Sequence, residues 1–377
     1  MYGKSYLHEL ETGSKQPSME VAERLDVALQ AGGQLTGLVH AAGESPRIDD
    51  GEVEALELAR RVATSDVSAE TLDRLELAAD ELAVAYARVP AIELRPRVQQ
   101  HLAYIGQLID TRATLAQRRR LMVVGGWLAL VGATVDIDLR RDAAGRAWLT
   151  TARQLAEHAE HAEIQAWCRE TEAWSLLGDG NYRRAVKLSQ EAQRLAPRGS
   201  SALIQAMAQE GRAVARLGDA AGTRRVLGRL DKLVSPLSRP DRPEHHYRYD
   251  PGKALWYTAT TLAWVGDPAA VDFARAVVTQ MEKPADGPPR LRRAALARVD
   301  LALALLRVGQ PDEAAATAEV AIAAGTLVPS NYWRAAEVVA GVERAGVERA
   351  ARLREAFEAH RPTAIVGSAC PRTAVDS

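Results

Sequence analysis

Residues 173–197 read AWSLLGDGNYRRAVKLSQEAQRLAP, and this stretch decides the fold that we expect for the chain. It predicts two helices joined by a turn over 178–182, where glycine can adopt the positive φ that reverses a chain tightly. Two antiparallel helices approach closely only where side chains are small. The small residues and the proline that closes the pair are Ala173, Ala185, Ala192 and Pro197. The stretch therefore predicts a close-packed helical hairpin.

The same arrangement recurs three more times along the chain, less regularly. The second copy has Gly211, Gly218-Asp219, Thr223 and Leu230; the third has Ala259, Gly266-Asp267, Val271 and Val278; the fourth has Ala302, Gly309-Gln310, Ala314 and Ala321. The markers at 185, 223, 271 and 314 lie 38, 48 and 43 residues apart. These spacings exceed the roughly 34 residues of an ideal tetratricopeptide repeat. We therefore expect an all-α protein whose bulk is an irregular α-solenoid.

The expected repeat array extends beyond these four copies. A further hairpin precedes them, with Gly125–Ala129 in its first helix, Asp136–Arg141 at its turn and Ala152 in its second helix, and one helix from Gly341 to His360 closes the array. Helix breaks are expected at Pro90, Pro96, Gly145, Pro197, 236–243, 284–289 and Pro329. The resulting divisions are an N-terminal unit over 1–42, a linker with connecting helices over 43–99, the repeat domain over 100–360 and a disordered tail over 361–377.

The composition is typical of a soluble, mostly helical protein. Of the 377 residues, 47% are hydrophobic, 26% are charged and only 5% are aromatic, a mixture rich in helix formers and far from the signature of disorder. Two distant cysteines, Cys168 and Cys370, form no disulfide framework and fit a reducing, cytoplasmic compartment. The apolar segment Leu121–Val135 is shorter than a bilayer span, so we expect a buried hairpin helix and no membrane association.

The N-terminal segment has a helix-turn-helix pattern. A helix is expected from Lys4 to Glu11, followed by a stop at Gly13 and a polar turn over 14–18. Ser18 stands where the N-cap of a second helix belongs, and that helix is expected to reach about Leu29. A short helix should begin at 34–39, and the loop 42–51 is the clearest linker.

These residues resemble the recognition helix and following turn of the xenobiotic-response-element-like helix-turn-helix family. The resemblance rests on Ser5-Tyr6-Leu7, Leu10-Glu11 and Gly13, then Pro17-Ser18 and the apolar Val21, Leu25 and Leu29. With the hairpins, whose best copy is similar to the tetratricopeptide repeat, it covers nearly the whole chain. The chain looks like the actinobacterial regulators that join such a DNA-binding unit to a tetratricopeptide-like domain.

The resemblance implies which residues contact DNA. The candidate base contacts are Lys4, Ser5, His8 and Glu9, and the candidate phosphate contacts are Lys15 and Gln16. A complete unit of this family has two helices before the recognition helix, which here would begin just after Met1. Residues 1–42 also carry three Lys or Arg against five Asp or Glu, and this balance opposes association with DNA. Either the true start lies upstream of Met1, or the chain is a remnant that has lost DNA binding.

Other conspicuous residues have plainer interpretations. The N-terminal helices could instead form an ordinary first hairpin of the array. The seven tryptophans indicate core and groove packing, with an aromatic-lined ligand groove as the alternative. His245 and His246 lie among prolines and are expected in a surface loop, since no second ligand group has the spacing of a metal site. Basic clusters at 118–120 and 290–293 are expected to be solvated faces.

The function that these patterns favour is transcriptional regulation. The N-terminal unit would contact DNA, and the array would bind an effector, or a peptide or protein partner in its groove, and mediate self-association as a homodimer. The alternative is a DNA-independent scaffold that binds proteins through the repeats. We find no phosphate loop, nucleophile elbow or dinucleotide fingerprint, so we expect no catalytic residue, cofactor or metal.

Overall fold

The computed structural model describes residues 4–12, 15, 17–43, 54–55, 67–284 and 289–361, and over these residues it is helical without any strand. The predicted all-α class is therefore confirmed. The chain divides into two compact units, Met1–Glu52 and Val53–Ser377, which are described separately. Most of the expected linker and nearly all of the expected tail lie outside the described residues.

The N-terminal unit contains three short helices, α1 (Lys4–Glu11), α2 (Met19–Leu29) and α3 (Gln34–Gly43). The predicted cap is present, because the N–H of Val21 donates to Oγ of Ser18 over 3.4 Å. Asp26 on α2 accepts from the N–H groups of Leu35 and Thr36 at 2.9 and 2.7 Å. This buried carboxylate thus caps the first turn of α3 and ties the two helices together.

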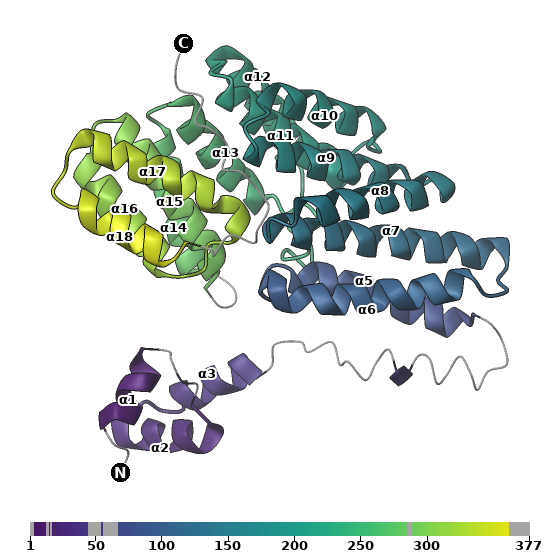
Figure 1. Cartoon of the computed structure of the whole chain (residues 1–377), viewed down its shortest axis with the longest axis horizontal. Coiled ribbons are helices and arrows are strands. Elements are labelled where there is room, and N and C mark those ends of the chain that lie inside the picture. The colour runs from purple at the N-terminus through teal and green to yellow at the C-terminus, as the bar shows by residue number, and fades with distance from the viewer. Residues whose placement is uncertain are drawn as a thin grey trace. The chain divides into compact units, whose positions relative to one another are not determined.

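The second unit is a succession of antiparallel helices, which Figure 1 shows lying side by side. It begins with α5 (Ala69–Ala85) and α6 (Ala91–Ile109). The paired helices that follow are α7 (Leu115–Asp138) with α8 (Asp142–His158), α9 (Ala162–Gly178) with α10 (Tyr182–Leu195), α11 (Ser201–Arg216) with α12 (Ala220–Val234), α13 (Gly252–Val265) with α14 (Ala270–Glu282), α15 (Leu291–Arg307) with α16 (Pro311–Ala323), and α17 (Tyr332–Ala345) with α18 (Ala350–Ala359).

Helical hairpins of this kind form because their turns contain glycine and their interfaces contain alanine. Gly180, Gly218, Gly266 and Gly309 have φ between 75° and 83°, each at one of the four predicted turns. Ala173, Ala185 and Ala192 of the best copy are fully buried, and so are Ala302, Ala314 and Ala321 of the fourth. The hairpins predicted from these positions are therefore confirmed.

For the third copy, the sequence pattern predicted the buried positions of the second helix one residue too late. The sequence predicted Val271 and Val278 at the interface, whereas the structure buries Ala270, Ala274 and Val277 there and leaves Val271 and Val278 partly exposed. Asp267, Pro268 and Ala269 form a longer turn before α14 than the single residue that follows Gly180 or Gly218. Because the turn is longer, α14 buries a different set of side chains from the one that the sequence pattern predicted.

Three predicted helix boundaries were wrong. Gly145 lies inside α8, where an added Cβ would stand 2.9 Å from Cγ1 of Ile137, so this glycine permits close helix packing instead of breaking the helix. Pro96 lies inside α6 near its start. The expected closing helix Gly341–His360 is two helices, because Gly346, with φ of 70°, ends α17 and reverses the chain.

The odd-numbered helices form a continuous inner layer. Each of α7, α9, α11, α13 and α15 contacts the next odd-numbered helix as well as its own hairpin partner, and α17 ends the series. The short 3-10 helix η1 (Pro329–Asn331) contacts the end of α7, so residues from the late part of the array meet its beginning. Side chains on the inner layer can therefore converge from hairpins that are far apart in sequence.

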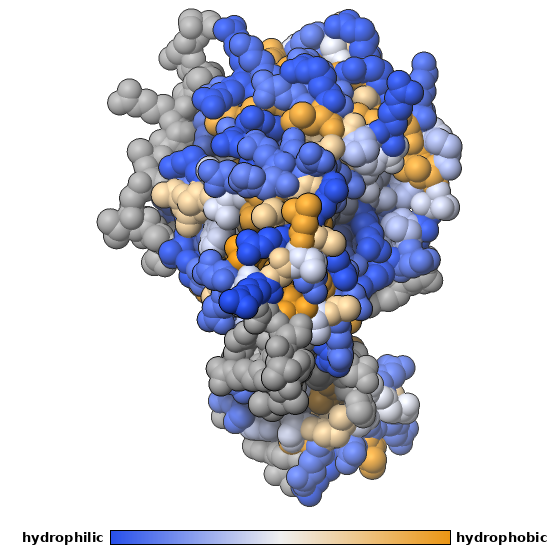
Figure 2. All heavy atoms as spheres, turned by 90° about the vertical axis from the view of Figure 1, so that its right-hand side faces the viewer, coloured by the Kyte–Doolittle hydropathy of each residue, from blue (hydrophilic) through white to orange (hydrophobic). Residues whose placement is uncertain are grey.

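The longest apolar helix belongs to this core. By length and composition α7 could cross a membrane, but 83% of its most apolar window is buried against the rest of the unit. The prediction of a buried hairpin helix over Leu121–Val135 is confirmed. Figure 2 shows a face dominated by hydrophilic side chains, with hydrophobic atoms gathered in small groups between them.

Candidate functional site

The residues expected to contact DNA lie on α1 and in the turn that follows. His8 and Glu9 are exposed on α1, and Lys15 is exposed in the turn. The side chains of Lys4 and Ser5, and the whole of Gln16, lie outside the described residues. Nζ of Lys15 is 3.8 Å from Oε2 of Glu9 and 4.6 Å from the centre of the Tyr6 ring. A candidate phosphate contact thus pairs with a candidate base contact, and exposed ion pairs of this kind are weak.

The second candidate site is a polar pocket on the inner layer of the repeat unit. Its volume is about 220 Å³. The charged and aromatic residues that line it are Tyr86, Asp138, Glu170, Trp174, Arg212, His246, Lys253, Trp256, Tyr257, Arg292, Arg293 and Arg334. They come from the ends of α5 and α7, from α9, α11, α13, α15 and α17 of the inner layer and, in the case of His246, from the segment between α12 and α13.

Two of the four arginines in this pocket have a carboxylate partner. Arg292 forms an ion pair with Asp138, and Arg334 forms one with Asp300. Asp138, fully buried, also accepts from Oη of Tyr86 over 2.7 Å and from Oγ of Ser330 over 2.8 Å. These contacts join α5, α7, α15 and η1 at one wall of the pocket.

The other two arginines rest on aromatic rings. The guanidinium of Arg212 lies 4.7 Å from the centre of the Tyr257 ring, and that of Arg293 lies 4.4 Å from Trp256. Neither guanidinium has a carboxylate within ion-pair distance among the residues that the structure describes. Burial lowers the pKa of Arg212 and lowers that of Arg293 to about 10, because removal from water disfavours the charged form.

Glu170 and Lys253 are a second pair of buried ionisable residues at the pocket. Glu170 accepts from Nε2 of Gln205 over 3.1 Å, and burial raises the pKa of its carboxyl to about 7. Burial lowers the pKa of Lys253 to about 7 as well. Nζ of Lys253 donates to the carbonyl oxygens of His245, His246 and Arg248 at 3.0–3.5 Å. Small changes in this environment can therefore change both charges near neutral pH.

Replacing Glu170 with Gln should flatten the dependence of stability on pH. The pKa of Glu170 rises from its usual 4.5 to about 7 on folding, so its contribution to stability is fully present below pH 4.5 and is lost as the pH rises through 7. The loss is on the order of 3 kcal/mol. Urea unfolding of both proteins between pH 4.5 and 8 measures this difference, in which the other titrating groups largely cancel. Parallel curves would contradict the assignment.

The segment 235–251, between α12 and α13, contributes His246 to the pocket, and it is placed differently from what we expected. We expected His245 and His246 in a surface loop, but His245 and Tyr247 are buried and His246 is partly buried. The N–H of His246 donates to the carbonyl of Ala83 over 3.1 Å, and the Tyr247 ring packs against Trp127 and Trp167 with centroids 5.2 and 5.1 Å apart. The prolines prevent this segment from forming a helix, and the Tyr247 ring packs into the inner layer.

Charged contacts also fasten this segment to α5. His245 and Arg248 both contact Asp80, at 3.2 and 2.8 Å, and Arg242 reaches Glu81 at 2.5 Å. Burial lowers the pKa of His245 to about 4 despite the nearby carboxylate, so its ring is neutral at pH 7. The segment is therefore a docked part of the repeat unit.

The expectation of solvated basic clusters was wrong at 290–293. Arg292 and Arg293 both line the pocket. The cluster at 118–120 behaves more as expected, because Arg120 pairs on the outside with Asp73 and Glu76. The tryptophans divide between the two interpretations: Trp167 is core, whereas Trp174 and Trp256 line the pocket.

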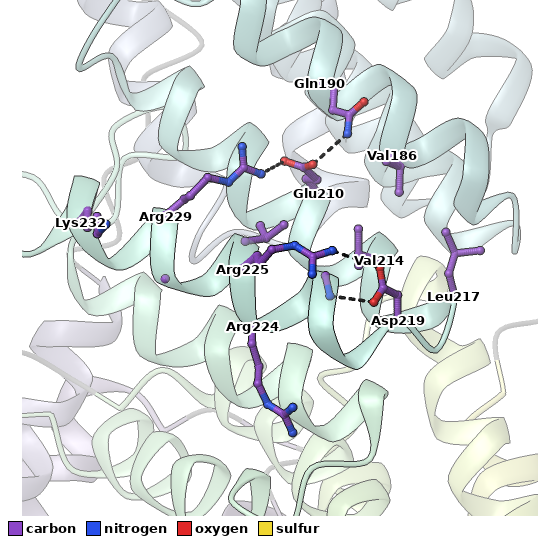
Figure 3. A pocket seen from close by; sticks show the side chains of 13 residues that line it. Val186, Gln190, Glu210, Val214, Leu217, Asp219, Arg224, Arg225, Arg229 and Lys232 are labelled. Carbon is purple, nitrogen blue, oxygen red and sulfur yellow. Dashed lines mark hydrogen bonds and ion pairs between the residues drawn. The ribbon is translucent and has the colours of Figure 1, made fainter.

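A wider groove of about 800 Å³ runs along α10, α11 and α12, and Figure 3 shows its basic side chains. Arg229 points to Glu210, which lies 2.8 Å away and also accepts from Gln190, and Arg225 points to Asp219. Arg224 reaches Asp267 at 3.5 Å. Because all three arginines already have carboxylate partners, this open groove has less unbalanced charge than the inner pocket.

Most residues of the inner pocket were not recognised from the sequence. Asp138, Glu170, Arg212, Lys253 and Arg334 each lie on a different helix, and no short motif connects them. One signal was present: Asp138 ends a long apolar helix, and a charge in such a position is rare unless it is paired. A partner such as Arg292, 154 residues away, is visible only in the folded chain.

Comparison with known proteins leaves the family open. No protein-family model matches the chain, and no curated protein gives a significant sequence match. The functional argument therefore rests on the geometry described above and on the resemblance of α1, its turn and α2.

Proposed function

We propose that this chain is a cytoplasmic transcriptional regulator that contacts DNA through α1 and binds an effector in its helical-repeat unit. The observation that carries the proposal is the local geometry of the N-terminal unit. Ser18 caps α2, and His8 and Glu9 stand exposed on the preceding helix. In the helix-turn-helix family that this segment resembles, the recognition helix presents such exposed side chains to the major groove.

The repeat unit supports the second half of the proposal. Its inner pocket is concave and combines aromatic rings with a few converging charges, as small-molecule sites commonly do. A homodimer would place two α1 helices on successive half-sites and would make the regulator symmetric. The alternative is a DNA-independent scaffold that binds proteins through the repeats. Such a scaffold would contain the same pocket, but α1 would need no function in it.

Fluorescence anisotropy with DNA from the protein's own promoter region tests the proposal. The full chain, and a version extended in frame upstream of Met1, should bind with an affinity that falls steeply between 50 and 200 mM salt. Lys15→Gln should weaken binding and reduce the salt slope by about 1, because one phosphate contact is lost. His8→Ala should reduce the preference for promoter DNA over a scrambled duplex.

Arg24→Gln is the matched control, because it removes the same charge from an exposed position on α2. It should change DNA affinity less than Lys15→Gln does. Absence of salt-dependent binding in both versions of the chain would favour the scaffold. Equal effects of Lys15→Gln and Arg24→Gln would remove the assigned phosphate contact.

A further inference from the structure

We infer that the inner pocket of the repeat unit binds a small organic dianion, either a dicarboxylate or a phosphate monoester. This inference specifies the effector of the proposed regulator, but its evidence lies entirely within the repeat unit. Arg212 and Arg293 are the residues that the structure assigns to the two negative charges.

The first argument is the charge balance of the pocket. Four arginines line it, and Asp138 and Asp300 neutralise two of them. Glu170 and Lys253 carry opposite charges, which cancel when both groups are ionised or when both are neutral. Two positive charges therefore remain on Arg212 and Arg293. Buried cations without a paired counter-charge are costly, and an anion that enters the pocket would relieve that cost.

The second argument is that these cations are positioned in advance. Tyr257 and Trp256 lie against the guanidinium groups of Arg212 and Arg293, and Arg212 also donates to the side chain of Gln209. Aromatic stacking limits the orientations of a guanidinium without using its charge on a carboxylate. A guanidinium fork matches carboxylate or phosphate oxygens with two parallel hydrogen bonds. The pocket therefore resembles a clamp for two oxyanion groups.

The third argument is an excess of hydrogen-bond donors. Within the described residues, Nε of Arg212, Nε of Arg334 and Nε1 of Trp256 have no hydrogen-bond partner. All three are donors only, and all three residues line the pocket. A ligand rich in acceptor oxygens suits such a wall, whereas a neutral or cationic ligand does not.

The size of the pocket limits the ligand to a small molecule. About 220 Å³ is below the roughly 300–1,000 Å³ of drug-sized sites. A four- or five-carbon dicarboxylate or a small phosphate ester fits this space. A peptide in an extended groove, which the repeat pattern alone favoured, needs more room than the pocket provides.

The inference can be tested by thermal unfolding and tryptophan fluorescence on the full chain, without DNA. The probes are succinate, glutarate and glycerol 2-phosphate, with succinamide and glycerol as neutral counterparts. At least one dianion should raise the unfolding temperature and change the emission of the tryptophans, which include Trp174 and Trp256 in the pocket. The preferred probe distinguishes the carboxylate class from the phosphate class.

Arg212→Gln and Arg293→Gln should each weaken binding of the preferred dianion by about 10- to 100-fold. Arg225→Gln, which removes an exposed arginine of the groove along α10, α11 and α12, should leave the affinity for the dianion unchanged. Binding of succinamide as tight as that of succinate, unchanged affinity in both pocket variants, or no dianion binding at millimolar concentration would overturn the inference. If a pocket variant fails to fold, the comparison of dianions with neutral probes in the wild type decides.

Failure here and failure of the proposed function are distinguishable. A chain that binds a dianion but not promoter DNA retains the pocket and loses the regulator. A chain that binds DNA but no dianion retains the regulator and loses this effector class.

Discussion

Replacing Asp138 with Asn is expected to lower the free energy of unfolding of the repeat unit by about 3–5 kcal/mol. The fully buried carboxylate forms an ion pair with Arg292 and accepts hydrogen bonds from Tyr86 and Ser330. Asparagine leaves the guanidinium buried without its counter-charge and directs an amide N–H₂ toward groups that donate. Urea denaturation at pH 7 measures the loss, and scanning calorimetry should show a lower unfolding temperature.

Two further variants separate this effect from general damage to α7. Asp179→Asn removes a partly exposed partner of Arg140 and should cost less than about 1 kcal/mol. The double variant Asp138→Asn with Arg292→Met should be more stable than Asp138→Asn alone, because no buried charge is left unpaired. A loss below about 1 kcal/mol in Asp138→Asn would show that the contact is not structural.

The hairpins could be predicted because their determinants are local. A turn glycine and the alanines on either side lie within about twenty residues of one another, as in Ala173, Gly180, Ala185 and Ala192. The positive φ of the turn glycine and the complete burial of the alanines both follow from this short-range geometry. The N-cap at Ser18 is equally local, so α2 began where expected.

The pocket could not be predicted because it depends on how the hairpins stack. Arg292 meets Asp138 only because the inner layer brings η1 and α15 to the end of α7. The proline-rich segment 235–251 has the composition of a surface loop. Its docking becomes visible in the folded chain, where the Tyr247 ring packs against Trp127 and Trp167. The register error in the third copy has a related origin, since the pattern did not indicate how many residues the turn at Gly266 would use.

The segment 235–251 itself provides the second large expected effect. Tyr247→Ala should destabilise the repeat unit by about 3–5 kcal/mol, because it removes a buried ring that contacts Trp127, Trp167 and His246. The hydroxyl adds only a 3.2 Å contact to Oγ1 of Thr134. Tyr247→Phe, which keeps the ring, should therefore lose about 1 kcal/mol. Urea denaturation of the three proteins, monitored by tryptophan emission, gives these differences.

Limited trypsin digestion then tests whether the ring fastens the segment or only fills space. If Tyr247 anchors it, Tyr247→Ala should be cleaved after Arg248 under native conditions well before the remainder of the repeat unit, although Arg242 and Arg248 retain acidic partners on α5. Those exposed or partly exposed ion pairs are too weak to hold the segment alone. Cleavage there should also move one wall of the pocket, since His246 and Lys253 would lose their positions. Equal cleavage of wild type and Tyr247→Ala would instead assign the anchoring to the contacts of His245, Arg242 and Arg248 with α5.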